Sequence, residues 1–212
     1  MPALFVVGIG PGIGTAVARR FAREGFVVGM VARRRETLDA AVAALDPGTP
    51  TWTRTADATD EEPLRAALRD FVAAHGVPDA VVYNAAIIQL DAPGDLSAAE
   101  HLDAWAVNVV GAITTAAELL PRMGAGSYTI TSGMPVPDPG LTSLSLGKAG
   151  VRALVELLAS RHGPDGVHVA SVTVGGPVAP GTDYDPDDIA EHYWRLHTQP
   201  ADRWEREVRH GC

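Results

Sequence analysis

The stretch Ala3-Leu4-Phe5-Val6-Val7-Gly8-Ile9-Gly10-Pro11-Gly12-Ile13-Gly14 decides the fold of this chain. Its first five residues are all apolar and stop at a glycine, which predicts a strand buried on both faces, as in a parallel sheet. The residues that follow, Ile13 to Glu24, predict a helix that closes at Gly25. A glycine-rich turn therefore joins the first predicted strand to the first predicted helix.

Strand and helix continue to alternate along most of the chain. Further strands are predicted at Phe26 to Ala32, Thr51 to Thr55, Ala80 to Tyr83, Tyr128 to Thr131 and Val167 to Val174, and further helices at Glu36 to Leu45, Asp60 to His75, Ala98 to Met123 and Ser143 to Arg161. Strict alternation with short links predicts an α/β fold, a Rossmann-type doubly wound parallel sheet with helices on both faces. We expect a single domain over residues 1–212. It should carry a short helical C-terminal extension from about residue 186, where Asp185-Pro186-Asp187-Asp188 is a helix-start pattern.

The glycine-rich turn from Gly8 to Gly14 carries the first indication of function. Glycines between a strand and a helix permit a tight turn, close approach of the backbone to a pyrophosphate, and a phosphate at the helix N-terminus. The spacing Gly8-x-x-x-Gly12-x-Gly14 differs from strict G-x-G-x-x-G, and a flexible turn without a ligand is the alternative. We predict that a dinucleotide binds here, in contact with Gly8, Gly10, Pro11, Gly12, Ile13 and Gly14.

The residues after the second strand indicate which dinucleotide binds. A site for NAD would place an acidic residue there for the ribose 2′-hydroxyl, whereas this chain has Arg33-Arg34-Arg35. The guanidinium group of arginine binds phosphate through two parallel hydrogen bonds, so Arg33 and Arg34 favour NADP(H). The alternative is that these arginines are solvent-exposed residues at the start of the next helix. After the third strand, Asp57-Ala58 is expected near the adenine ring, and after the fourth, Asn84-Ala85-Ala86 is expected on the ribose side, although either could be a plain turn.

Composition and charge exclude several classes of protein. Hydrophobic residues make up 46% and charged residues 20% of the chain, which is typical of a folded globular protein. The formal net charge of −9 argues against a general nucleic-acid or anionic-membrane binder. The single cysteine, Cys212, cannot form an internal disulfide, and no stretch approaches about 18 consecutive apolar residues, so we expect a cytoplasmic protein. The seven histidines lack the clustered spacing of a zinc site, and no metal is predicted.

Taken together, these pieces resemble the short-chain dehydrogenase/reductase family over about Ala3 to Pro177. Besides the turn, Asp57 and Asn84-Ala85-Ala86, the matching pieces are Asn108, Thr131-Ser132, Lys148-Ala149-Gly150 and Gly176-Pro177. The resemblance implies a catalytic tetrad of Asn, Ser, Tyr and Lys, in which Asn108, Ser132 and Lys148 are the matching residues. It also implies cofactor contacts from Lys148 and Pro177. Two alternatives are structural. Ser132 could be a strand-end residue whose hydroxyl caps a turn, and Asn108 could be a helix residue whose side chain bonds to the backbone.

The tyrosine of this tetrad, four residues before the lysine, corresponds to Leu144. In the family the tyrosine transfers a proton, while the lysine holds the nicotinamide ribose and lowers the tyrosine pKa. Leucine cannot transfer a proton, a function typically worth 10²–10⁴-fold in rate. The four tyrosines of the chain lie elsewhere, at positions 83, 128, 184 and 193. With no phenol beside it, Lys148 is expected to anchor the ribose hydroxyls.

Three functions fit this pattern. The first is an NADP(H)-dependent oxidoreductase acting on a small-molecule carbonyl or alcohol with an atypical proton donor, such as Ser132, Ser145, Asp138 or a substrate group. The second is a redox-neutral isomerase, cyclase or lyase on the same fold, and the third is a non-enzymatic NADP(H) sensor or scaffold. The resemblance also implies a homodimer or tetramer formed through the long helices. The short segment Val178 to Asp185 implies an open pocket, or one completed by another chain.

Overall fold

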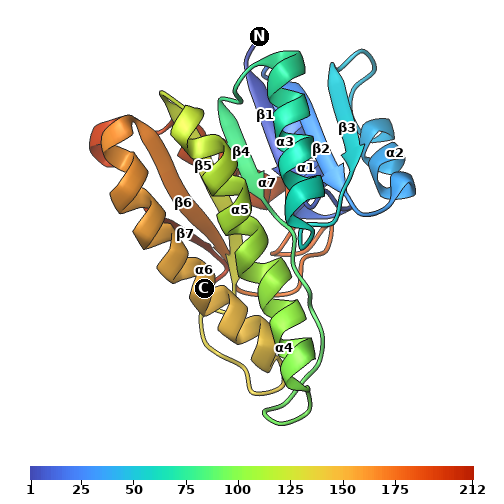
Figure 1. Ribbon diagram of the computed structural model, residues 1–212, viewed down its shortest axis with the longest axis vertical. Helices are drawn as coiled ribbons and strands as arrows, with labels where there is room; N and C mark the ends of the chain where they lie inside the picture. The colour runs from blue at the N-terminus through green and yellow to red at the C-terminus, as the bar shows by residue number, and fades with distance from the viewer.

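The computed structural model describes all residues, 1–212, and contains one seven-stranded sheet in the order β3-β2-β1-β4-β5-β6-β7 (Figure 1). Every neighbouring pair of strands is parallel. The strands are β1 (Ala3–Val7), β2 (Val27–Ala32), β3 (Thr51–Thr55), β4 (Ala80–Tyr83), β5 (Gly126–Gly133), β6 (Val167–Val174) and β7 (Glu207–His210). This confirms the predicted doubly wound parallel sheet.

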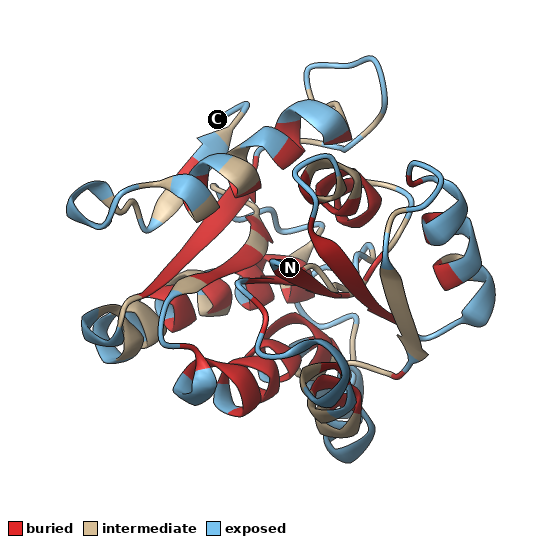
Figure 2. Ribbon diagram, turned by 90° about the horizontal axis from the view of Figure 1, so that it is seen from above, coloured by how far each residue is buried: buried red, intermediate tan, exposed pale blue.

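Helices cover both faces of the sheet, and each face has its own apolar core. The helices are α1 (Ile13–Ala22), α2 (Arg35–Ala43), α3 (Glu61–His75), α4 (Ala98–Trp105), α5 (Gly111–Leu119), α6 (Thr142–His162) and α7 (Pro186–Thr198). One core joins the sheet to α1, α2 and α7, and the other joins it to α3, α5 and α6. Figure 2 shows the buried strands between helices whose buried sides face the sheet. Because all strands run the same way, the segments that follow them gather at one edge, where ligands bind in such folds.

The long helix predicted from Ala98 to Met123 is interrupted. A π-helical turn, η1 (Ala106–Val110), separates α4 from α5, and a 3-10 turn, η2 (Leu120–Arg122), ends the run. The Tyr83 hydroxyl donates a hydrogen bond to the Val107 carbonyl within the π turn. A side chain at Gly111 would place its Cβ 2.2 Å from that hydroxyl oxygen, so tyrosine and glycine fit together there. Single π turns occur frequently at functional sites, and this one carries Asn108.

The same run, Ala98–Arg122, is long and apolar enough to cross a membrane by length and composition. Its most apolar window is 67% buried inside the structure, as expected for a core helix. In Figure 1, α4 and the first turns of α6 extend side by side beyond the sheet. These two helices therefore flank the edge where the strands end.

The C-terminal extension contributes a strand as well as a helix. The strand β7, Glu207–His210, pairs with β6 and was not predicted from the sequence. Only Val208 of its four residues is buried, so the edge strand lacks an apolar run. Trp204 stacks on His168 with ring centroids 4.9 Å apart, and Trp194 packs edge-on against Phe21. Trp204 therefore covers the sheet at β6, and Trp194 covers α1.

Candidate functional site

The glycine-rich turn closes tightly against the end of β4. Gly8 has φ +86°, a backbone conformation that residues with side chains rarely adopt. A Cβ at this position would lie 2.3 Å from the Ala85 nitrogen. A Cβ on Gly14 would lie 3.1 Å from the Ile9 Cα. Gly12 begins α1 without a side-chain cap, which leaves the first backbone N–H groups of the helix without a side-chain acceptor. The turn thus offers close backbone approach and uncapped donors to an anion.

A cavity of about 270 Å³ lies beside this turn at the edge of the sheet. Most residues predicted to touch a dinucleotide line it together: Gly8, Gly10, Pro11, Arg33, Arg34, Asp57, Ala58, Asn84, Ala85 and Ala86. Gly12, Ile13 and Gly14 do not line this cavity; they form the start of α1. Pro177 is not in the wall either; it follows β6, and the next residue, Val178, lies 3.7 Å from where a Gly12 Cβ would be.

Two arginines in this cavity have no acidic partner. Arg33 and Arg34 form no ion pair or side-chain hydrogen bond, and both are exposed. The neighbouring Arg35 differs, because its Nε donates to Asp39 at 2.9 Å within α2. Thr37, in the first turn of α2, also lines the cavity and was missed by the sequence analysis. Its position in the first turn of the helix that follows the arginines was the available signal.

The two turn motifs after β3 and β4 differ in what their side chains do. Asp57 lines the cavity, and one of its carboxylate oxygens accepts hydrogen bonds from the Thr59 nitrogen and hydroxyl, both at 2.9 Å. Asp57 therefore stabilises the turn after β3 and also lines the cavity. Asn84 donates from Nδ2 to the Gly8 carbonyl at 2.9 Å and accepts at Oδ1 from the Thr131 hydroxyl at 2.8 Å. Asn84 thereby joins the glycine-rich turn to β5.

Thr131 is the centre of this network, although no role of its own was predicted for it. Its hydroxyl bonds to Asn84 and, at 2.6 Å, to the Tyr193 hydroxyl of α7. Its carbonyl accepts a hydrogen bond from Lys148 Nζ at 2.9 Å. One residue therefore links α7, α6 and the glycine-rich turn. The sequence carries no signal for this role because the three partners are far apart along the chain.

Asn108, Ser132 and Lys148, the three predicted tetrad residues, gather around α6. All three are buried. Asn108 accepts at Oδ1 from the Ile87 nitrogen at 3.3 Å, and its side chain lies against α6, since a Gly147 Cβ would be 2.8 Å from it. The Asn108 Nδ2 and Ser132 Oγ atoms have no hydrogen-bond partner. Buried polar atoms without partners are rare in folded proteins and indicate a site that a ligand or water completes.

Burial also changes the acidity of Lys148. Its ammonium lies in the protein interior, 6% exposed, with no carboxylate beside it. Burial lowers the pKa of Lys148 from its ordinary value to about 8, because the charged form is poorly solvated there. Leu144, one helical turn earlier, is also buried.

No tyrosine hydroxyl bonds to Lys148. The hydroxyls of Tyr83 and Tyr128 donate to carbonyls of η1 and α5, and that of Tyr184 donates to the Gly211 carbonyl at 3.0 Å. The fourth, Tyr193, bonds to the Thr131 hydroxyl. Neither of the two downstream tyrosines, Tyr184 and Tyr193, therefore folds back to meet the lysine.

Comparison with known proteins agrees with this arrangement. The family model described as short chain dehydrogenase matches residues 2–187. An uncharacterized short-chain type dehydrogenase/reductase of Sinorhizobium fredii is 30% identical over 174 residues, covering 77% of this chain and 68% of the relative. The glucose 1-dehydrogenase of Gluconobacter oxydans is 28% identical over 186 residues, covering 84% of this chain and 70% of the relative.

Solved structures give the same result. An alcohol dehydrogenase from the archaeon Thermococcus sibiricus, complexed with 5-hydroxy-NADP, superposes with a TM-score of 0.87 at 25% identity, covering 99% of this chain and 96% of that one. A metagenomic short-chain oxidoreductase in complex with NADP superposes with a TM-score of 0.88 at 25% identity, covering 99% and 97%. With the sheet order, the glycine-rich turn and the family match in agreement, this chain belongs to the short-chain dehydrogenase/reductase family.

Proposed function

We propose that this protein is an NADP(H)-dependent oxidoreductase that interconverts a small-molecule carbonyl and alcohol, with a proton donor other than tyrosine. The observation that carries the cofactor assignment is the pair Arg33 and Arg34. Both line the cavity next to the glycine-rich turn, and neither has an acidic partner within the chain. In a chain with a net charge of −9, two unpaired guanidinium groups at one cavity suit a phosphate.

Each part of NADP(H) can be assigned to a group of residues at the site. The turn from Gly8 to Gly14 would hold the pyrophosphate, Arg33 and Arg34 the 2′-phosphate, and Asp57-Ala58 the adenine ring. Asn84-Ala85-Ala86 would line the ribose side, and Pro177 the nicotinamide end. The unpartnered atoms Asn108 Nδ2 and Ser132 Oγ fit a site that bound molecules complete. When bound, the nicotinamide would supply or accept the electron pair and one hydrogen.

Turnover tests this function directly. The purified protein, mixed with NADPH and a panel of aldehydes, ketones and quinones, should consume NADPH, followed as loss of absorbance at about 340 nm, with the matching alcohol as product. Product formation without a change in nicotinamide absorbance would support the redox-neutral enzyme instead. Tight NADPH binding without any product would support a sensor or scaffold. The absence of a tyrosine beside Lys148 is the observation that keeps these two alternatives in the test.

Tyr193→Phe should weaken NADPH binding about 3- to 10-fold, because it removes the hydroxyl that holds Thr131, and through it Asn84 and the glycine-rich turn. The loss corresponds to one ordinary hydrogen bond. Burial raises the pKa of the Tyr193 hydroxyl, so the group remains protonated over the working range of pH. Isothermal titration calorimetry measures the change.

Tyr128→Phe is the matched control. Its hydroxyl is equally buried and bonds to the Ala112 carbonyl at 2.8 Å, outside this network. Both variants should lose similar stability, and only Tyr193→Phe should lose affinity for NADPH. Equal loss of affinity in both variants would assign the effect to general destabilisation.

We also propose that the protein is a homo-oligomer formed through α4, α5 and α6. Large apolar side chains are exposed on these helices and on η1 between α4 and α5: Leu102, Trp105, Val110, Ile113, Leu146 and Leu157. An exposed apolar surface of this kind is typical of a subunit interface. Sedimentation velocity should give a dimer or tetramer, and Leu102→Glu, at a side chain 68% exposed, should shift it toward the monomer. A monomeric wild-type protein at micromolar concentration would contradict the proposal. A cytoplasmic location stays a prediction.

A further inference from the structure

We propose that Lys148 itself donates the proton to the substrate oxygen, in the role that a tyrosine would otherwise fill. This inference rests on the proposed oxidoreductase function and names the proton donor for it. Lys148 is the only lysine in the chain; all other residues among the 17 lysines and arginines are arginine. Arginine remains protonated at any working pH, so Lys148 is the one strongly basic side chain that can give up a proton.

The surroundings of Lys148 leave its ammonium free to act. Its hydrogen-bond acceptor within the chain is the Thr131 carbonyl, so two of its three N–H groups have no protein acceptor. Of the titratable groups on elements packed against α6, Tyr128 of β5 bonds to the Ala112 carbonyl, His168 of β6 to the Leu196 and Glu205 carbonyls, and Glu100 of α4 to Ser97. His101 of α4 lines a separate cavity with Ser143 and Leu146, and neither His101 nor Asp103 of α4 bonds to Lys148. On α6 itself, Arg152 donates to the Gly133 and Met134 carbonyls. No charged side chain therefore pairs with Lys148 and fixes its proton.

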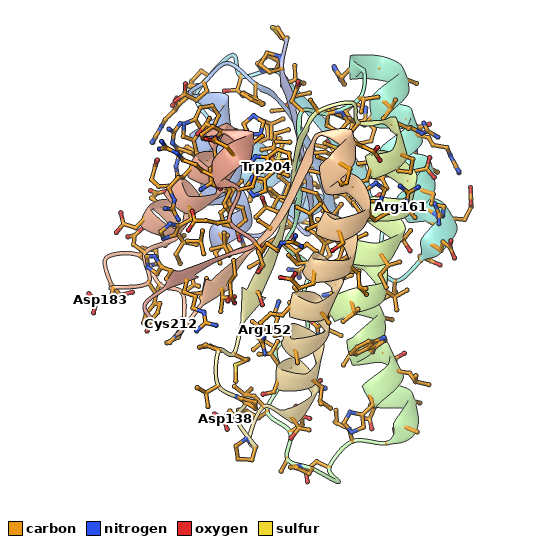
Figure 3. All side chains as sticks on the ribbon, turned by 90° about the vertical axis from the view of Figure 1, so that its left-hand side faces the viewer. Asp138, Arg152, Arg161, Asp183, Trp204 and Cys212 are labelled. Carbon is orange, nitrogen blue, oxygen red and sulfur yellow. The ribbon has the colours of Figure 1, made fainter.

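The other candidate donors are engaged or lack a base. The Ser145 hydroxyl accepts from the Asp138 nitrogen at 3.1 Å and donates to the Asp138 carbonyl at 3.3 Å. The Asp138 carboxylate accepts from the Gly140 nitrogen at 2.8 Å in the exposed loop after β5 (Figure 3). A serine hydroxyl is a much weaker acid than an ammonium group, and the Ser132 hydroxyl has no bonded group in the chain that would resupply its proton.

The remaining groups suit a position for the substrate oxygen near Lys148. Nζ contacts the carbonyl of Thr131, and Ser132 is the next residue in β5. Side chains alternate along a strand, so Ser132 points to the same face of the sheet as Tyr128 and Ile130, which belong to the core that α6 joins. Its unpartnered hydroxyl can hold the substrate oxygen by a hydrogen bond while Lys148 supplies the proton. Leu144, on the same face of α6, contributes no polar group.

The proton balance of the step is simple. The carbonyl π bond breaks as its carbon gains one hydrogen and an electron pair from the reduced nicotinamide, and its oxygen gains a proton from Nζ. One C–H bond and one O–H bond form, and Lys148 is left as the neutral amine. The amine then regains a proton from water. A donor whose pKa lies near the working pH is the most effective, and burial sets the pKa of Lys148 at about 8.

A single lysine makes the test direct, because protein labelled with [ε-¹³C]lysine gives one lysine signal in the NMR spectrum. Its chemical shift should titrate with a midpoint near pH 8 in the free protein. The titration is repeated in the NADPH complex, where kcat for reduction of 9,10-phenanthrenequinone should be high below the measured midpoint and fall tenfold per pH unit above it. A midpoint above pH 10, or a kcat that is flat from pH 7 to 9.5, would overturn the proposal.

Two substitutions separate proton donation from electrostatic attraction. Lys148→Met and Lys148→Arg should both lower kcat by about 10²–10⁴-fold, because neither side chain gives up a proton. Ser145→Ala tests the alternative donor at Ser145: kcat should stay within about threefold, and a loss as large as that of Lys148→Met would assign the proton to Ser145 and overturn the proposal. A Lys148→Arg variant with nearly full kcat would show that only the positive charge matters and would overturn proton donation. NADPH binding by the wild type without reduction of any carbonyl would likewise overturn it and leave the cofactor site intact, whereas absence of NADPH binding would contradict the proposed function itself.

Discussion

Leu144→Tyr is expected to raise kcat for carbonyl reduction by about 3- to 10-fold. A tyrosine at 144 would lie one helical turn before Lys148, on the same face of α6, where the ammonium lowers the pKa of a neighbouring phenol. The tyrosine would be a second proton donor beside Lys148, so the gain is smaller than the full contribution of general acid catalysis, which Lys148 already supplies. Initial rates at saturating NADPH and 9,10-phenanthrenequinone measure the change.

Leu144→Phe is the matched control for this prediction. It adds the same ring without the hydroxyl, so any gain that it shares with Leu144→Tyr comes from shape and not from proton transfer. We expect kcat of Leu144→Phe at or below that of the wild type, since a larger side chain enters a buried position. If Leu144→Tyr folds, binds NADPH and remains as slow as Leu144→Phe, the substrate oxygen does not lie within reach of a side chain at residue 144.

The double substitution Arg33→Ala/Arg34→Ala should weaken NADPH binding by about 100-fold or more and leave NADH binding within about threefold. A hydrogen bond to a charged group contributes about 1.5–3 kcal/mol, and two guanidinium groups without acidic partners face the same cavity. NADH lacks the 2′-phosphate, so its affinity does not depend on them. Fluorescence titration of both nucleotides gives the two dissociation constants.

Arg35→Ala serves as the control for charge alone. It removes one positive charge from the same segment, but its guanidinium is paired with Asp39 and does not line the cavity. NADPH affinity should therefore change by less than about threefold. Equal loss in the Arg35→Ala variant would attribute the effect to the net charge of the region, and equal loss of NADH and NADPH would contradict 2′-phosphate recognition.

The fold could be predicted from the sequence because the patterns that indicate strands and helices are local. The apolar runs of β1, β2 and β4 are buried in a parallel sheet, in which strands buried on both faces are typically apolar throughout. The strand β7 escaped prediction because it is a short edge strand in which only Val208 is buried. The bounds of the π turn around Asn108 could not be read from the sequence, because Tyr83 and Gly111 contact each other beside it only in the folded chain.

The candidate site likewise contains residues whose place could be predicted from the sequence and residues whose role could not. The glycine-rich turn and the residues that follow β2, β3 and β4 come together because parallel strands end at a common edge, and their positions could be read from the sequence. The roles of Thr131 and Tyr193 depend on contacts between residues 62 positions apart, which a single sequence does not encode locally. The unpartnered atoms of Asn108 and Ser132 and the pKa of Lys148 depend on burial, which only the structure describes.

Calorimetric titration of the wild-type protein with NADPH and with NADH tests the central claim most directly. The account predicts micromolar or tighter binding of NADPH at one site per chain, and NADH weaker by about tenfold or more because it cannot reach Arg33 and Arg34 with a phosphate. Equal affinity for the two nucleotides would contradict the assignment of NADP(H). Binding of neither would contradict the dinucleotide site itself.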